Sequence, residues 1–312
     1  MTGAWTLRAY RHGDDDALVA LWNATLVRDP ISPARFRRQT LLHPGFRPEG
    51  CLLAELGGEP AGFALALAPG TPPPPAGAAR AVSGRLVGLG VLPRARRQGL
   101  GASLLDASLT FLRDRGCARV GVAAHEYYAA GVDADAYADG IAFLERRGFG
   151  RVGEAVAMGR DLYDLSWPDQ ARAAEARLRT EGIEVRSFDP LSTFALVEYF
   201  RAEFPDWVEF FVRKLDAGHE RDEIVVATHG DRVVGYCQHL DADHVGPFGV
   251  AAAYRDRGIG TVMLYRLLDA MRQKGYRFAW FGETGRARPY YERAGFRLTR
   301  SYVLLRRDLV ES

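Results

Sequence analysis

The chain has 312 residues, of which 47% are hydrophobic and 26% are charged, and its formal net charge is +2. A chain of this length and composition is able to bury a sizeable core and suits two domains better than one. The nearly balanced charge argues against a nucleic-acid partner, because such proteins carry a strongly basic surface.

The three cysteines, Cys51, Cys117 and Cys237, lie far apart and do not have the spacing of metal ligands. We therefore expect reduced thiols in the core and no metal site. The N-terminal residues lack the apolar run of a secretory signal, and no apolar run reaches bilayer length. These features predict a cytoplasmic protein without a membrane partner.

The first half of the chain predicts a mixed order of strands and helices. Residues 7–10 form a short strand, residues 14–22 a helix, and residues 51–67 two strands joined by a tight turn. A proline-rich run at residues 69–75 predicts a surface loop. A glycine-bearing loop at residues 91–101 then leads into a helix with one apolar face.

The same pattern returns in the second half. The loop and helix that start at residue 91 align without a gap, over nearly thirty residues, with those that start at residue 250, 159 positions later. The matched loop positions are Arg96 with Arg255, Gly99 with Gly258, and Gly101 with Gly260. Such self-similarity indicates an internal duplication.

The ends of the halves also match, since residues 145–149 and 292–296 both end in Gly-Phe. The first half has twelve additional residues within 125–140, a segment rich in tyrosine and acidic residues. It is either a solvated loop or part of a pocket for a cationic substrate. Ser166 is expected to cap a connecting helix that ends at Thr180. We place the domains at residues 1–165 and 166–312.

The loop at residues 249–260 lies between a strand end and a helix start. Free backbone N–H groups and the positive end of the helix dipole favour an anion there. Gly258 and Gly260 leave room for a phosphate, and Arg255 and Arg257 add positive charge. A tight turn without a ligand is the alternative. A dinucleotide fingerprint fits less well, because it needs glycine or alanine where the chain has Met263.

The R-x-x-G-x-G loop after a Gly-Val strand end, found twice, resembles the pyrophosphate loop of the GNAT acyltransferase superfamily. The resemblance implies an α/β fold with two tandem GNAT domains, each with a mixed sheet, and acetyl-CoA as the cofactor. It also implies a β-bulge at Gly249-Val250 that lets two strands splay apart around the coenzyme. The implied coenzyme-binding residues are Val250, Arg255, Arg257, Gly258, Ile259 and Gly260 in the second half, and Val91, Arg96, Gly99 and Gly101 in the first.

The resemblance further implies direct transfer of an acetyl group to an amine, most simply that of a small molecule. Tyr291 takes the position of the general acid for the leaving thiolate, and the Val250 N–H that of a donor to the thioester oxygen. Glu283, at a strand end beside the splay, is the first candidate base. Weaker candidates for the base are His244, His239, Asp241 and Asp243; Thr284 shares the strand end with Glu283, and Tyr290 is expected to serve packing.

The first half has Leu144 at the position of Tyr291, although its loop is intact. We therefore expect catalysis in the C-terminal domain and a degenerate N-terminal domain that either binds coenzyme without turnover or stabilises its neighbour. A non-catalytic acyl-CoA sensor or assembly module is the competing function.

Overall fold

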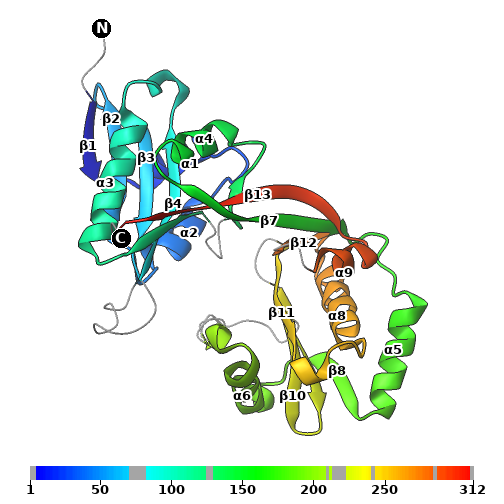
Figure 1. Ribbon diagram of the computed structural model, residues 1–312. Helices are drawn as coiled ribbons and strands as arrows, with labels where there is room; N and C mark the ends of the chain where they lie inside the picture. The colour runs from blue at the N-terminus through cyan, green and yellow to red at the C-terminus, as the bar shows by residue number, and fades with distance from the viewer. Residues whose placement is uncertain are drawn as a thin grey trace. The chain divides into compact units, whose positions relative to one another are not determined.

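The computed structural model describes residues 5–69, 82–123, 129–208, 211–212, 223–239, 243–283 and 287–309. The chain divides into two compact units (Figure 1). Unit 1 comprises Met1–Val156, Gly282–Gly285 and Arg300–Ser312, and unit 2 comprises Ala157–Phe281 and Arg286–Thr299. Helices and mixed sheets alternate in both, which confirms the predicted α/β fold class.

The strands of unit 1 belong to a nine-stranded sheet with the order β1-β2-β3-β4-β5-β13-β7-β12. A short additional strand, β6, pairs with β13. In chain order the main elements are β1 (Trp5–Ala9), α1 (Asp15–Thr25), α2 (Pro33–Phe36), β2 (Cys51–Leu56), β3 (Glu59–Leu67), β4 (Ser83–Val91), α3 (Leu100–Asp114), β5 (Arg119–Val122), β6 (Val132–Asp133), α4 (Ala138–Glu145), β7 (Gly150–Asp161) and the C-terminal β13 (Arg297–Asp308).

The two faces of this sheet are covered by different helices. Side chains of α1 pack on one face, where Trp22 stacks on Phe63 with ring centroids 5.4 Å apart. Leu100 and Leu104 of α3 pack on the other face, against Ala64. Because neighbouring residues of a strand point to opposite faces, Phe63 of β3 packs against α1 and Ala64 packs against α3. The result is a helix–sheet–helix core.

Unit 2 repeats this plan around a four-stranded sheet in the order β11-β10-β9-β8. Strand β12 adjoins it through a single parallel bridge between His244 and Trp280. Its main elements are α5 (Asp169–Thr180), β8 (Ile183–Ser187), α6 (Thr193–Glu203), β9 (Ile224–His229), β10 (Arg232–His239), β11 (Val245–Val250), α8 (Ile259–Gln273), β12 (Phe278–Glu283) and α9 (Arg288–Arg293).

The core of unit 2 again has two layers. On one face Phe200 of α6 meets Tyr236 of β10 edge to face, with ring centroids 4.9 Å apart. On the other face Met263 of α8 lies over Gly235, where an added β-carbon would come within 2.7 Å of the methionine sulfur. The glycine therefore lets α8, and with it the loop before the helix, lie close to the sheet.

The last strand of each half continues into the unit formed mainly by the other half. The Leu309 N–H donates to the Ala118 carbonyl at 2.8 Å in unit 1, and the Leu162 N–H donates to the Arg277 carbonyl at 3.0 Å in unit 2. These two bonds match in the repeat, since Ala118 and Arg277 are 159 residues apart.

A second pair of contacts repeats in the same way. The guanidinium of Arg307 donates to the Arg147 carbonyl at 2.7 Å, and that of Arg160 donates to the Ala294 carbonyl. The duplicated halves thus exchange their final strands, β7 and β13, reciprocally. The boundary near residue 165 stays a prediction of where the duplicated segments join, because the compact units are not continuous in sequence.

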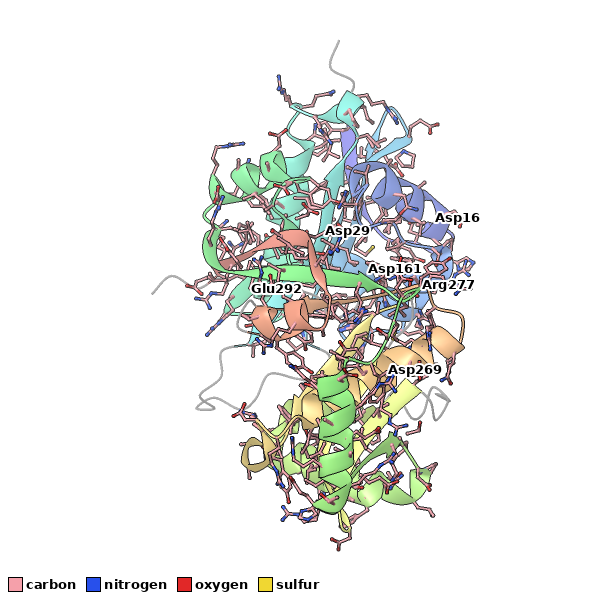
Figure 2. All side chains as sticks on the ribbon, turned by 90° about the vertical axis from the view of Figure 1, so that its right-hand side faces the viewer. Asp16, Asp29, Asp161, Asp269, Arg277 and Glu292 are labelled. Atoms are coloured by element: carbon pink, nitrogen blue, oxygen red, sulfur yellow. The ribbon has the colours of Figure 1, made fainter. Side chains whose placement is uncertain are left out.

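An ion-pair network holds β13 in unit 1. Arg300 lies between Asp29, labelled in Figure 2, at 2.7 Å and Asp133 at 2.8 Å, and all three side chains are less than 20% exposed. The Tyr137 hydroxyl donates to Asp29 at 2.9 Å. Burial works to raise the pKa of Asp133, but the Ala136 N–H and Arg300 outweigh it and lower that pKa. The acidic insert therefore serves, at Asp133 and Tyr137, to fix the exchanged strand.

Several smaller predictions are also decided. The three cysteines are buried and free, as expected. The Ser166 cap is wrong, because α5 begins at Asp169 with Pro168 at its N-cap position. Of the proline-rich run only Pro69 lies within the described residues. In the part of the chain that the structure describes, no helix has the length and apolar character needed to cross a bilayer.

Replacing Arg300 tests the network. Arg300→Gln should lower the free energy of unfolding by about 2–4 kcal/mol, because it leaves two largely buried carboxylates without their cation. Since the folded-state pKa of Asp133 is depressed, its contribution is present above the unfolded value near 4 and is lost as the pH falls below it. The difference between the two proteins in urea titrations should therefore shrink below about pH 4. Arg306→Gln, at an exposed position of the same strand, is the control; equal losses in both variants would contradict the assignment.

Candidate active site

A β-bulge interrupts the same strand in both halves. The register of β4 with β3 shifts opposite Val87, and that of β11 with β10 shifts opposite Gly246-Pro247. Val87 and Gly246 are 159 residues apart. The bulge predicted at Gly249-Val250 thus lies three residues earlier, where Gly246 has a φ of +131° and Pro247 has no N–H to offer the ladder.

Both strands lose their neighbour beyond the bulge. β4 pairs with β5 only over Ser83–Leu86, and β11 meets β12 only at His244. The rest of each strand has no partner on this side among the described residues. Among the described residues, each strand therefore has an open edge beyond its bulge, as the family resemblance implied, and we call the space beside this edge the gap.

The open edge of β11 exposes the predicted oxyanion donor. The Ala251 N–H donates to the Val234 carbonyl at 2.9 Å, so Val250, one residue earlier, points its N–H away from β10 and toward the gap. The equivalent bond from Leu92 to Ala61 orients Val91 in the same way. The orientation of both N–H groups is compatible with the predicted role, which stays a prediction.

The two glycine loops have the same backbone conformation. Arg96 and Arg255 each donate through Nε to the carbonyl at the strand end, that of Val91 at 3.0 Å and that of Val250 at 3.2 Å. Left-handed φ angles recur at matched positions, namely Arg97 (60°) with Asp256 (62°) and Gly99 (90°) with Gly258 (83°). The loop shape is therefore encoded twice by the same local sequence.

Each loop ends in a helix whose first turn offers unpaired donors. The first intrahelical bond of α8 runs from the Val262 N–H to the Gly258 carbonyl at 3.1 Å. The N–H groups of Ile259, Gly260 and Thr261 precede it and have no acceptor inside the helix. Together with the helix dipole they form a site suited to a phosphate.

The surroundings of the two loops differ. Helix α5 packs against the second loop, where Arg177 donates to the Arg257 carbonyl at 2.7 Å and Glu181 forms an ion pair with Arg257. A β-carbon on Gly258 would lie 3.1 Å from that of Ala174. At Gly99 the nearest atom would be 4.0 Å away, on Trp5. The first loop is thus unsupported on this side among the described residues.

This support changes the electrostatics expected for the second loop. Arg257 forms an ion pair with Glu181, and Arg255 uses its Nε for the Val250 carbonyl. The backbone N–H groups are therefore open to a ligand, beside the remaining guanidinium N–H groups of Arg255. Sequence reasoning did not identify Arg177 or Glu181, whose only signal is their place on the connecting helix.

The two tyrosines of α9 lie beside this loop. Tyr291 is 8% exposed, and its ring packs on Phe281 with centroids 3.8 Å apart and on Phe296. Tyr290 reaches the first turn of α8, because a β-carbon on Gly260 would lie 3.4 Å from its hydroxyl oxygen. Both rings are near Phe248 of β11. The structure therefore brings the loop, the open strand and the predicted acid into one region of unit 2.

The candidate bases are less well placed. His244 and Asp243 lie at the closed end of the gap, where β11 still meets β12 and the Asp243 carbonyl accepts from the Trp280 N–H. His239 is buried beside Tyr276. Glu283 ends β12, but its side chain lies outside the described residues, as do Asp241 and Thr284.

Aromatic residues that the sequence did not single out cover the other side of β11. Phe204 and Trp207 stack with centroids 4.1 Å apart, and a β-carbon on Gly249 would come within 2.6 Å of Phe204. The Tyr199 hydroxyl donates to the Gly249 carbonyl at 2.9 Å. Only glycine at position 249 permits this close packing, which fixes the strand that carries Val250.

Comparisons with known proteins identify the family of this chain. The sequence profile described as "Acetyltransferase (GNAT) family" matches residues 16–149 and 188–296, more than half of the chain. A search of curated proteins found no match.

Three solved structures have the same fold. The first is the GCN5-related glucosamine N-acetyltransferase region of a fungal multi-domain beta-N-acetylglucosaminidase, with a TM-score of 0.83 and 20% identity over 98% of this chain and 38% of that one. This chain therefore spans well under half of that protein. A GCN5-related N-acetyltransferase from Sphaerobacter thermophilus has a TM-score of 0.72 and 21% identity over 99% and 96% of the two chains. A tandem GNAT protein from the clavulanic acid biosynthesis pathway has a TM-score of 0.68 and 15% identity over 99% and 100%.

Alanine substitution at the two left-handed glycines tests the unequal support of the loops. Gly99→Ala should cost about 1 kcal/mol of unfolding free energy, because its strain comes from the backbone alone. Gly258→Ala should cost about 1–3 kcal/mol more, since its methyl group crowds Ala174. Chemical denaturation of both variants measures the difference, and equal costs would show that α5 does not press on the second loop.

Proposed function

The chain belongs to the acetyltransferase (GNAT) family, and we propose that it transfers an acetyl group from acetyl-CoA directly to the amine of a small molecule, in its C-terminal half. One observation carries the proposal. The unpaired edge of β11, the free N–H groups at the start of α8 and the tyrosines of α9 converge in unit 2.

The residues present fit an acyl-CoA substrate. Its pyrophosphate would accept from the N–H groups of Ile259, Gly260 and Thr261, where the absence of a side chain on Gly260 leaves room. Its extended pantetheine arm offers amide groups that suit an open strand edge, so it would lie along β11. The Val250 N–H would then face the thioester oxygen.

The transfer needs few groups from the protein. The neutral amine attacks the thioester carbon, a C–N bond forms, and the C–S bond breaks. The Val250 N–H stabilises negative charge on the carbonyl oxygen during the attack. The amine loses one proton, and the leaving sulfur gains one from Tyr291. A phenol remains protonated at neutral pH and is therefore a suitable donor.

We propose Glu283 as the group that takes the proton from the amine, directly or through water, because it ends β12 at the mouth of the gap. His244 and Asp243 are less suitable, since they lie where the gap is closed.

The first half supports a different role. Its loop has the same conformation, but Leu144 is part of the core of unit 1 and has no proton to donate. Val91, Arg96, Gly99 and Gly101 are thus suited to bind coenzyme without turnover. A non-catalytic acyl-CoA sensor is the competing function for the whole chain, and it predicts binding without release of free thiol.

A carboxylate placed in the first turn of α8 or of α3 tests which loop binds coenzyme A. Thr261→Glu should weaken coenzyme A binding at the second site at least tenfold by repulsion, while the helix dipole favours the new charge in the free protein. Ala102→Glu is the matched variant in the first loop. It should leave the affinity of the second site for coenzyme A unchanged. Calorimetry on both variants measures the effect. Unchanged binding in Thr261→Glu would contradict the second-loop assignment.

The acid is tested by removing one hydroxyl. Tyr291→Phe keeps the ring among Phe281 and Phe296, so coenzyme affinity should be retained. Turnover should fall by about 10²–10⁴, the range of general acid–base groups. Release of free thiol from acetyl-CoA with a panel of amines is the assay. Full activity in this variant would exclude Tyr291 as the acid, and no thiol release from the wild-type protein with any amine would favour the sensor.

A further inference from the structure

The hydroxyl group of Tyr290 is buried without a hydrogen-bond partner in the described structure. It lies at the first turn of α8, since a β-carbon on Gly260 would be 3.4 Å from it. The Thr261 hydroxyl is near enough to lower the pKa of Tyr290 as a hydrogen-bond donor, but the pair does not reach hydrogen-bond geometry in the described structure. Thr261 is thus the neighbour that competes with a ligand for this hydroxyl. A buried hydroxyl without a partner costs free energy, so such a group needs an explanation.

The internal repeat shows what the hydroxyl adds. Position 290 corresponds to Phe143 in the first half, 147 residues earlier. A β-carbon on Gly101, the counterpart of Gly260, would lie 3.8 Å from the tip of the Phe143 ring. Both halves therefore place an aromatic ring against the second loop glycine, and packing requires only that ring. The hydroxyl occurs in the second half alone.

The hydroxyl is suited to donate a hydrogen bond rather than a proton. Burial raises the pKa of Tyr290 well above its ordinary value, with a smaller contribution from the neighbouring Tyr291. The group therefore stays protonated throughout the neutral range. Its neighbours are the free N–H groups of Gly260 and Thr261, which are donors as well. A place lined by donors suits an acceptor, and the helix dipole favours an anionic one.

We infer that Tyr290 is a further binding residue of the second loop, whose hydroxyl donates to the pyrophosphate of acyl-CoA alongside the first-turn N–H groups of α8. The inference rests on the proposed function and assigns the two tyrosines of α9 to different tasks. Tyr290 binds the phosphate end, and Tyr291 serves the reacting end.

Paired ligands and variants test this assignment. The measurements use the full chain carrying Ala102→Glu, so that only the second site contributes. Calorimetric titrations with coenzyme A and with pantetheine, which lacks the pyrophosphate, compare the parent with Tyr290→Phe. We expect about a tenfold or greater loss of affinity for coenzyme A, as for a hydrogen bond to a charged group, and no change for pantetheine. Tyr163→Phe, at an exposed position outside the site, is the control and should alter neither affinity.

The stability of the ligand-free protein gives an independent readout. Because the hydroxyl has no partner there, Tyr290→Phe should leave the free energy of unfolding unchanged or raise it. A loss of stability would overturn the inference by showing a structural bond. Equal coenzyme A affinity in both proteins, or equal losses for coenzyme A and pantetheine, would overturn it as well. If the parent protein binds no coenzyme A, the proposed function itself fails.

Discussion

The site depends on one constraint, the loss of a neighbour for β11 beyond His244. Backbone N–H and C=O groups must find partners, and an open strand edge inside a folded domain offers a row of them. The bulge at Gly246-Pro247 begins this opening, and the close packing of Phe204 on Gly249 holds the strand in place while it lacks a neighbour. An extended ligand with amide groups is the partner that such an edge fits best.

Because the final strands are exchanged, each unit contains residues of both halves of the chain. Unit 1 needs β13 from the end of the chain, where Arg300 binds Asp29 and Asp133, and unit 2 needs the end of β7. The nine-stranded sheet draws strands from both halves, whereas the four-stranded sheet of unit 2 lies wholly in the second half. The first half therefore has a structural reason to persist even where it lacks a catalytic hydroxyl, because the second half depends on its last strand.

Much of this could be predicted from the sequence, because the duplication supplied an internal comparison. The loops, helix faces and final Gly-Phe pairs align at fixed offsets, and the fold class follows from them. The exchange could not be predicted, because the two final strands end in the same tripeptide, Arg160-Asp-Leu162 and Arg307-Asp-Leu309. Identical ends do not reveal whether a strand pairs within its own half or with the other half. The position of the bulge depends on the register of the strands, and the sequence pattern does not fix that register to a single residue. Tyr290 was assigned to packing because a helical position does not reveal which hydroxyl is left unpaired.

The two loops differ in whether a helix packs against them, so comparing them shows which features come from the loop sequence and which come from α5. Arg96 and Arg255 make the same bond, and Gly99 and Gly258 adopt the same left-handed conformation, although only the second loop contacts α5. The shape is therefore specified by the loop sequence itself. What α5 adds is restraint, through Arg177 and Glu181, and the neutralisation of Arg257. A restrained loop loses less conformational entropy when it binds, so under the proposed function we expect tighter binding at the second loop, although both loops present the same donors.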